Sequence, residues 1–488
     1  MQEDKRINKS SVVSAIIWKA LERTFSQGLN LLIQIVLARI LLPEDFGAVA
    51  ILSAIIGYAS IFVQAGLGTA LIQKRQLEEK DVNTLFTGSM VIASFFYVVL
   101  FLIAPFIANR YQMPNLVWSF RVLSLTLFLG AINSIQTALF TRQMRFKAIF
   151  FRSLLAIPIS GAIGIMMALN GYGLWALIGQ SLVNNIVIVV YMSLDKKIII
   201  HWGFSKDSAK QLYSFSGKIL LSGLVSGFSD TCRTMVIAKR YSTKDLAYYD
   251  KAYSYSSLVT QIVSLTISNV MLPTFSRAQD NRKSLLLMVR KSVRMTSFVM
   301  FPVLLCLCAA SKPFIIVLLT EKWAPAVPFF MLFCIFRMPG LISGIDKQLY
   351  YSLGNSSISL YYEIGLLIAQ ITALFITVPI SVPAIAIGAF IVEMFGNIVL
   401  YTISDIKYGY KWNDRISDLK KPFLNGLIAA SLVYSVSLLR YSYIITLIIQ
   451  VVVGVVSYYV LSKITRDNCL LELNSLLREK ISSFRRKK

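Results

Sequence analysis

The chain has 488 residues, of which 56% are hydrophobic and only 15% charged, and its mean hydropathy is +0.65. This composition excludes an ordinary soluble domain, because runs of about 20 mainly apolar residues are what cross a hydrocarbon core of about 30 Å. The formal charge of +25 does not indicate a nucleic-acid partner, since the basic residues flank apolar runs instead of forming one soluble face.

About fourteen apolar runs follow one another along the chain, separated by short polar stretches. The first run is interpreted as an uncleaved helix, because no small-residue cleavage site follows it. The first and seventh runs carry charged residues in mid-helix. The sequence therefore predicts an all-α polytopic membrane protein with spans near 11–40, 47–70, 83–107, 118–141, 148–169, 173–193, 213–239, 246–272, 292–319, 326–352, 357–378, 382–404, 422–439 and 443–463.

The placement of Lys and Arg predicts the orientation. If the N-terminus is cytoplasmic, most loop Lys and Arg fall in the N-terminal segment, the even-numbered connections and the C-terminal tail, and few fall in the opposite loops. This asymmetry is the positive-inside rule. We therefore expect a multi-pass protein of the cytoplasmic (inner) membrane with both termini in the cytoplasm.

No signature of enzyme chemistry accompanies these runs. The five cysteines are scattered, and the single histidine, His201, has no second histidine to form a metal site. Nucleophile elbows, P-loops and metal-ligand clusters are missing from the sequence. We therefore expect no metal, no resident cofactor and no catalytic residue.

A short motif recurs at a constant offset of 200 residues. Val36-Leu37-Ala38-Arg39 and Glu44-Asp45-Phe46-Gly47 correspond to Val236-Ile237-Ala238-Lys239 and Lys244-Asp245-Leu246-Ala247. Six spans separate the copies, so both halves have the same orientation, as in a parallel repeat about the membrane normal. Two six-helix lobes would then enclose a central cavity. The predicted parts are a cytoplasmic N-terminus (1–10), an N-lobe (11–193), a cytoplasmic linker (194–212), a C-lobe (213–404), two added helices (405–463) and a basic cytoplasmic tail (464–488).

Charged side chains inside the spans are the candidates for function, because a charge at mid-bilayer costs about 2.5–3.5 kcal/mol on the insertion scale. In the first span one polar stripe holds Lys19, Arg23, Ser26, Asn30 and Gln34, with Glu22 beside it. The seventh span repeats this pattern with Lys218, Ser222, Ser226, Asp230 and Arg233. Both stripes are predicted to face the central cavity.

The tenth span adds a third polar face. Arg337, Lys347 and Tyr351 share one side of it, and Asp346, Glu363, Glu393 and Arg121 are further charged residues within spans. One interpretation is that Arg337 and Lys347 pair with Asp346 or Glu363 and only hold helices together. The other is that they bind cargo. Basic residues outnumber acidic ones in the spans, which favours an anionic cargo. Two glycines four apart, Gly223 and Gly227, predict close helix packing.

Several short motifs resemble the oligosaccharide flippases (Wzx-type polysaccharide transporters) of the MOP superfamily, whose fold is also that of the MATE transporters. The motifs are spread over residues 11 to about 400. They are Leu42-Pro43-Glu44-Asp45-Phe46-Gly47, Gly66-Leu67-Gly68-Thr69-Ala70-Leu71-Ile72-Gln73, Phe215-Ser216-Gly217-Lys218, Ala247-Tyr248-Tyr249, Lys251-Ala252-Tyr253 and Lys322-Trp323-Ala324-Pro325-Ala326-Val327-Pro328.

The resemblance implies two six-helix lobes that alternate access to an undecaprenyl-pyrophosphate-linked oligosaccharide, the repeat unit of an O-antigen, capsule or exopolysaccharide. It also implies coupling to an H⁺ or Na⁺ gradient and polysaccharide polymerase machinery as a partner. Two phosphates need cationic groups, and Arg binds them bidentately. The candidate pyrophosphate and glycan ligands are Lys19, Arg23, Lys218, Arg233, Arg337 and Lys347, and the candidate coupling residues are Glu22, Asp230 and Glu363.

The seventh span departs from the family pattern. Relatives tend to carry a basic residue there and an acidic one about three positions later, whereas here Asp230 precedes Arg233. A family role of the acidic position therefore does not transfer to Arg233. Asp230 either exchanges a proton or cation when phosphate reaches Arg233, or forms a static pair three residues apart.

Three other functions remain as alternatives. A multidrug exporter of related fold would carry acidic cavity residues for cationic drugs. A membrane glycan polymerase or ligase would need a large outward loop and a catalytic constellation. A peptidoglycan-precursor flippase shares the fold and differs only in its cargo.

Overall fold

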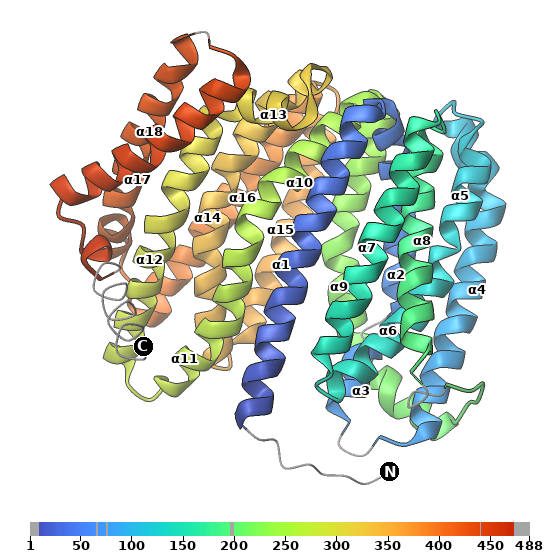
Figure 1. Ribbon diagram of the computed structural model, residues 1–488. Coiled ribbons are helices and arrows are strands. Elements are labelled where there is room, and N and C mark those ends of the chain that lie inside the picture. Colours follow the sequence, from blue (N-terminus) through green and yellow to red (C-terminus); the bar gives the residue numbers. More distant parts are fainter. Residues whose placement is uncertain (1–8, 65–66, 75–76, 196–199, 440, 473–488) are drawn as a thin grey trace, which may run out of the picture. The chain divides into compact units, whose positions relative to one another are not determined.

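The protein is described by a computed structural model that covers residues 9–64, 67–74, 77–195, 200–439 and 441–472 (Figure 1). The described residues are helical and loop segments without β-strands. Helices are expected for a chain in lipid, because each backbone N–H and C=O must find its partner within the chain. The fold class predicted from the sequence is confirmed.

Eleven helical segments of the described chain are long and apolar enough to cross a membrane. The predicted number of fourteen is not confirmed by this criterion. Three further long helices, α1 (Lys9–Ile40), α9 (Lys206–Arg240) and α10 (Thr243–Thr266), correspond to the first, seventh and eighth predicted spans, and α1 and α9 carry the two polar stripes. The protein is nevertheless a multi-pass membrane protein.

The chain forms two compact units, Met1–Ala247 and Tyr248–Lys488. Within the first unit α1 packs on α7, α7 on α8, and α9 on α2, α3 and α4. Most of α9 falls in the predicted C-lobe (213–404), and the lobe boundaries stay predictions. The helices of this unit are α1 (Lys9–Ile40), α2 (Pro43–Gln64), α3 (Leu67–Gln73), α4 (Glu79–Arg110), α5 (Leu116–Ser124), α6 (Thr126–Arg142), α7 (Phe146–Leu169), α8 (Leu174–Ser193) and α9 (Lys206–Arg240).

The second unit is built around α12, which packs on α14 and α17, and α17 packs on α18 at the red end of the chain (Figure 1). Its elements are most of α10 (Thr243–Thr266), η1 (Ile267–Met271), α11 (Leu272–Arg277), α12 (Arg282–Ala309), α13 (Ser311–Leu319), η2 (Glu321–Ala326), α14 (Val327–Ser352), α15 (Ser356–Thr377), α16 (Val382–Tyr408), α17 (Trp412–Val436), η3 (Ser437–Leu439) and α18 (Tyr443–Ile464).

Local sequence explains where several helices begin and end. Asn281 and Ser381 cap α12 and α16, each accepting a hydrogen bond from the backbone N–H three residues later, at 3.1 Å. Gly409 ends α16 with a φ of 77°, a left-handed conformation that glycine adopts without a Cβ penalty. The next helix, α17, begins at Trp412, ten residues before the predicted span at 422–439.

The 200-residue repeat appears in the helix boundaries. Helices α1 and α9 end at Ile40 and Arg240, and the next helices, α2 and α10, begin at Pro43 and Thr243. Both boundaries are therefore offset by the same 200 residues as the motif. The repeated sequence forms the same helix–turn–helix corner twice.

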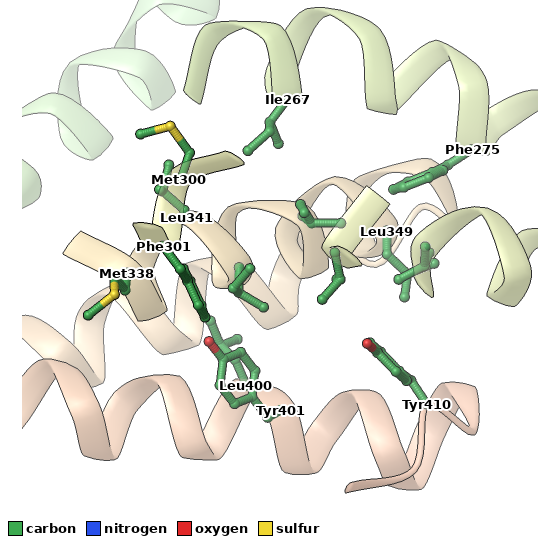
Figure 2. Packing of buried hydrophobic residues seen from close by; sticks show 14 of the residues in the cluster. Ile267, Phe275, Met300, Phe301, Met338, Leu341, Leu349, Leu400, Tyr401 and Tyr410 are labelled. Carbon is green, nitrogen blue, oxygen red and sulfur yellow. The ribbon is translucent and has the colours of Figure 1, made fainter. Parts of the chain in front are cut away.

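A cluster of buried apolar side chains from α12, α14 and α16 forms the core of the second unit (Figure 2). Phe301, Leu341 and Leu400 are nearly or fully buried in it. Tyr401 and Tyr410 lie at its edge and direct their hydroxyl groups to polar partners. This core positions the charged residues described next.

Candidate functional site

In the first unit the charged residues of the α1 stripe point to two different environments. Glu22 turns toward α7, where its Oε1 accepts hydrogen bonds from Ser153 Oγ at 3.0 Å and from Ser26 Oγ at 3.3 Å. Lys19 and Arg23 are exposed instead, and Lys19 Nζ lies 5.7 Å from the centre of the Phe146 ring. The predicted carboxylate is therefore anchored between helices, while the two cations remain accessible.

An intramembrane arginine that sequence analysis overlooked lies beside this group. Arg152 of α7 donates from Nη1 to Asn133 Oδ1 at 3.0 Å and to Thr137 Oγ1 at 2.7 Å, both on α6. Its buried Nε has no partner among the described residues. The signal was present in the sequence, because Arg152 lies inside the predicted span at 148–169, where a charge marks a partner or a function.

Helix α9 carries the second predicted stripe. Asp230 and Arg233 form an ion pair through Oδ1 and Nη2, with the Asp230 side chain 62% exposed and that of Arg233 only 14% exposed. The pair predicted from the spacing is thus present. The side chain of Lys218 lies outside the described residues.

Close packing places α9 against α2, as the two glycines predict. A Cβ added at Gly223 would lie 3.1 Å from Ile61 Cγ2, and one added at Gly227 would lie 2.8 Å from Ile61 Cδ1. Phe228 adds a ring contact to Tyr58, with 6.1 Å between centroids. The packing interpretation of these glycines is confirmed.

In the second unit Arg337 pairs with no carboxylate of the described residues. Its Nε donates to Ser256 Oγ and its Nη2 to the Tyr253 carbonyl, each at 3.0 Å, and the guanidinium lies 4.7 Å from the centre of the Tyr253 ring. Arg337 therefore fastens α14 to α10. The suggested pairing of Arg337 with Asp346 or Glu363 was wrong.

Lys347 does have the suggested carboxylate partner. Its Nζ forms an ion pair with Glu363 Oε1 on α15 and lies 4.8 Å from the centre of the Tyr362 ring. The side chains are 24% and 45% exposed. This pair is accessible, so a competing anion can reach Lys347.

Asp346 has a partner that sequence analysis missed. Arg415 binds it bidentately, with Nη1–Oδ2 and Nη2–Oδ1 distances of 2.9 Å, and both side chains are almost completely buried. Ser404 Oγ donates to the same carboxylate at 2.9 Å. The predicted spans at 382–404 and 422–439 leave Arg415 in the connection between them, whereas it lies in the first turns of α17. Asp346 is thus a structural anchor.

A second ionic group extends this anchor to α12. Arg290 donates from Nε and Nη2 to Asp418 at 2.9 and 3.1 Å, and its Nη1 lies 3.0 Å from Asp414. Tyr410 donates its hydroxyl to Asp418 at 3.0 Å, and burial raises the pKa of Tyr410. These bonds clamp the beginning of α17 to α12 and α14.

The predicted site residues therefore fall into separate groups. Lys19, Arg23 and the Asp230–Arg233 pair belong to the first unit, and Arg337 and the Lys347–Glu363 pair to the second. Among the described residues no group of three or more His, Cys, Asp or Glu side chains could hold a metal ion. The accessible charged groups are cations, which are suited to an anion, and carboxylates, which are suited to a cation.

A family model described as "Polysaccharide biosynthesis protein" matches residues 36–328. The chain is 25% identical over 427 residues to the succinoglycan biosynthesis transport protein ExoT of Rhizobium meliloti (strain 1021), covering 87% of this chain and 84% of that protein. It is 23% identical over 331 residues to the lipopolysaccharide biosynthesis protein WzxC of Escherichia coli (strain K12), covering 67% of each chain.

Solved structures with the same fold are also transporters. The lipid II flippase MurJ in an inward closed conformation matches with a TM-score of 0.75 at 17% identity, covering 92% of this chain and 98% of that one. An inward-facing multidrug resistance MATE family transporter of the MOP superfamily matches with a TM-score of 0.63 at 16% identity, covering 83% and 99%. At these identities the likeness concerns the fold alone.

Proposed function

Because the chain belongs to the polysaccharide biosynthesis protein family, we propose that it is a flippase for undecaprenyl-pyrophosphate-linked oligosaccharides, the repeat units of an O-antigen, capsule or exopolysaccharide. The names of ExoT and WzxC, a succinoglycan transport protein and a lipopolysaccharide biosynthesis protein, support this class of cargo. Its membrane is the bacterial cytoplasmic membrane, with both termini inside. The protein acts as a transporter and not as an enzyme.

The observation that carries this proposal is the excess of accessible cations in polar helices of a membrane protein. Lys19 and Arg23 are exposed, and Arg233 and Lys347 each pair with a carboxylate whose side chain is 62% and 45% exposed, respectively. Only the glycan and pyrophosphate need a polar route, because the polyprenyl tail can remain in lipid. Phosphate oxygens bind Arg and Lys strongly at low dielectric.

The proposed mechanism is alternating access through a central cationic cavity between an N-lobe and a C-lobe. Lys19, Arg23, Lys218, Arg233, Arg337 and Lys347 supply its pyrophosphate-binding groups. Cargo phosphate competes with Asp230 for Arg233 and with Glu363 for Lys347. Each carboxylate released in this way needs a new countercharge, since an unpaired charge in a poorly hydrated site is costly.

Glu22, Asp230 and Glu363 are the proposed coupling residues, and H⁺ or Na⁺ is the proposed ion. Glu22 accepts two hydroxyl hydrogen bonds and retains lone pairs for a proton or cation. Asp230 and Glu363 lose their basic partner when phosphate binds. Ion binding is thereby linked to cargo binding.

The test is the export of glycan by cells that carry neutral replacements. We expect Arg233→Gln and Lys347→Gln to abolish export and to accumulate lipid-linked oligosaccharide while protein abundance stays near wild type. Lys291→Gln is the control, because its pair with Glu472 is a surface contact with side chains 60% and 45% exposed. Normal export by neutral variants at all six cationic positions would reject the cationic cavity.

A peptidoglycan-precursor flippase is the second candidate, favoured by the fold match to MurJ. Vesicles that contain the purified protein separate the two cargoes. We expect translocation of undecaprenyl-pyrophosphate-linked oligosaccharide and none of lipid II. Translocation of lipid II alone would replace the proposed cargo with the peptidoglycan precursor. The MATE match makes a multidrug exporter a further alternative, but the basic excess is opposite to what cationic drugs need.

A further inference from the structure

A largely apolar groove opens beside α17 in the second unit. Its volume is about 860 Å³, near the upper end of the range of about 300–1,000 Å³ for small-molecule sites. Figure 2 shows three of its lining residues, Phe301, Met338 and Tyr401, at the edge of the buried core. The groove lies between α17 and the helices α12, α14 and α16.

The ionic clamp at the beginning of α17 explains why a groove persists there. Arg415–Asp346 and Arg290–Asp418 hold the first turns of α17 to α14 and α12. The lining residues Leu419, Phe423 and Leu424 follow directly along α17. The walls of the groove are therefore held by buried bonds, and a ligand finds a site that is already formed.

One polar group in the apolar wall lacks a partner. Asn397 of α16 is 1% exposed and its Oδ1 accepts from Ser343 Oγ, but its Nδ2 has no partner among the described residues. If the amide is turned by 180°, the oxygen becomes the unpaired atom. An unpaired polar atom at membrane depth is unfavourable, because no water is there to satisfy it. The groove thus contains an unused hydrogen-bonding group that a ligand can satisfy.

A basic side chain of the groove lies at nearly the same depth in the membrane as Asn397. Lys420 lines the groove, is exposed and forms no ion pair among the described residues. At a rise of 1.5 Å per residue, Lys420 is about 12 Å from the start of α17 at Trp412, and Asn397 is about 16 Å from the end of α16 at Tyr408. A short turn joins these two helix ends, so the two groups are a few ångströms apart in depth, with Lys420 nearer the membrane surface.

We propose that this groove binds an anionic phospholipid. The lipid phosphate pairs with Lys420, a glycerol ester carbonyl accepts a hydrogen bond from Asn397 Nδ2, and the acyl chains lie along Ile335, Met394 and Ile398. A basic side chain beside an apolar surface is the arrangement that binds anionic head groups. This inference goes beyond cargo transport and does not depend on it.

The test uses native mass spectrometry of the full chain in detergent with added phosphatidylglycerol. We expect wild type to bind phosphatidylglycerol and to bind phosphatidylethanolamine more weakly. Lys420→Gln should weaken phosphatidylglycerol binding about fivefold, as for one basic residue near an anionic surface. Lys421→Gln is the matched control, because Lys421 bonds the Thr465 carbonyl and does not line the groove.

A second pair of variants tests the groove by shape. Met394→Trp should fill it and abolish binding, whereas Val399→Trp, on an exposed face of α16 outside the groove, should leave binding unchanged. Equal binding by wild type, Lys420→Gln and Met394→Trp would overturn the proposal. Loss of undecaprenyl phosphate binding, without loss of phosphatidylglycerol binding, in Met394→Trp would overturn it too, since the occupant of the groove would then be a polyprenyl carrier.

Discussion

Glu44 and Lys244, which are equivalent positions of the 200-residue repeat, form an ion pair with an Nζ–Oε1 distance of 3.4 Å. Beside them the backbone of the two copies is in contact, because a Cβ on Gly47 would lie 1.8 Å from the Thr243 carbonyl oxygen. The two helix–turn–helix corners that the repeat encodes therefore meet within the first unit. The two copies of the repeat carry opposite charges at these positions, where identical charged residues would repel each other.

Exchanging the charges of Glu44 and Lys244 tests whether their ion pair stabilises the contact between the two corners. Single replacements Glu44→Lys and Lys244→Glu each bring like charges together, whereas the double replacement restores the pair. Because both side chains are about half exposed, we expect a coupling of about 0.2–1 kcal/mol in a double-mutant cycle of thermal unfolding. A double variant as unstable as the sum of the single variants would show that the contact contributes nothing.

Replacing Gly47 by alanine should separate the corners. The added Cβ clashes with backbone that has no flexible end to move away, so we expect a lower Tm and reduced transport. Gly57→Ala in the same helix is the control, because nothing lies within 4 Å of its Cβ position. That variant should be neutral or stabilised by up to about 1 kcal/mol from helix propensity. Equal effects of the two replacements would contradict the contact.

Removing one member of the buried Asp346–Arg415 pair should strongly destabilise the second unit. We expect Arg415→Met to lower the free energy of unfolding by about 3–5 kcal/mol, because it leaves a buried carboxylate without its partner. The double variant Asp346→Leu/Arg415→Met should recover much of that loss. Thermal unfolding in detergent measures both, and a double variant less stable than Arg415→Met would refute the buried-charge explanation.

Cys469 should resist thiol reagents in the folded protein. Burial, with the nearby Asp467 carboxylate, raises its pKa to about 12, and the thiolate is the reactive form. We therefore expect maleimide to label Cys469 only after unfolding, as mass spectrometry of tryptic peptides would show. The folded state keeps a proton that an unfolded thiol loses above about pH 8.5, so this group lowers stability as pH rises above that value. Rapid labelling of native Cys469 at pH 7 would contradict its burial.

Asp230 should be needed for gradient-driven transport if it is a coupling residue. In vesicles with an imposed pH or Na⁺ gradient, we expect Asp230→Asn to lose stimulation by the gradient while wild type keeps it. Glu78→Gln is a control, because Glu78 pairs with Lys80 at the surface. Full gradient-driven transport by Asp230→Asn would leave Asp230 with only a structural role beside Arg233.

The membrane class and the repeat were readable from the sequence because both depend on local order. Apolar runs of membrane length are a property of consecutive residues, and the motif at Val36 and Val236 recurs at a constant offset that the ends of α1 and α9 reproduce. The Asp230–Arg233 pair was also predictable, since three residues along one helix bring two side chains to the same face.

Tertiary structure decided which charge pairs with which. Nothing in the sequence indicates that Arg415 has a buried partner, or that the neighbours Asp346 and Lys347 pair with different helices. In the structure Asp346 of α14 pairs with Arg415 of α17, whereas Lys347 pairs with a glutamate of α15. Partners 69 and 16 residues apart are chosen by helix packing, and periodicity along one helix carries no information about the helix opposite. The sequence determined that these charges need partners, and the packing of the helices selected the partners.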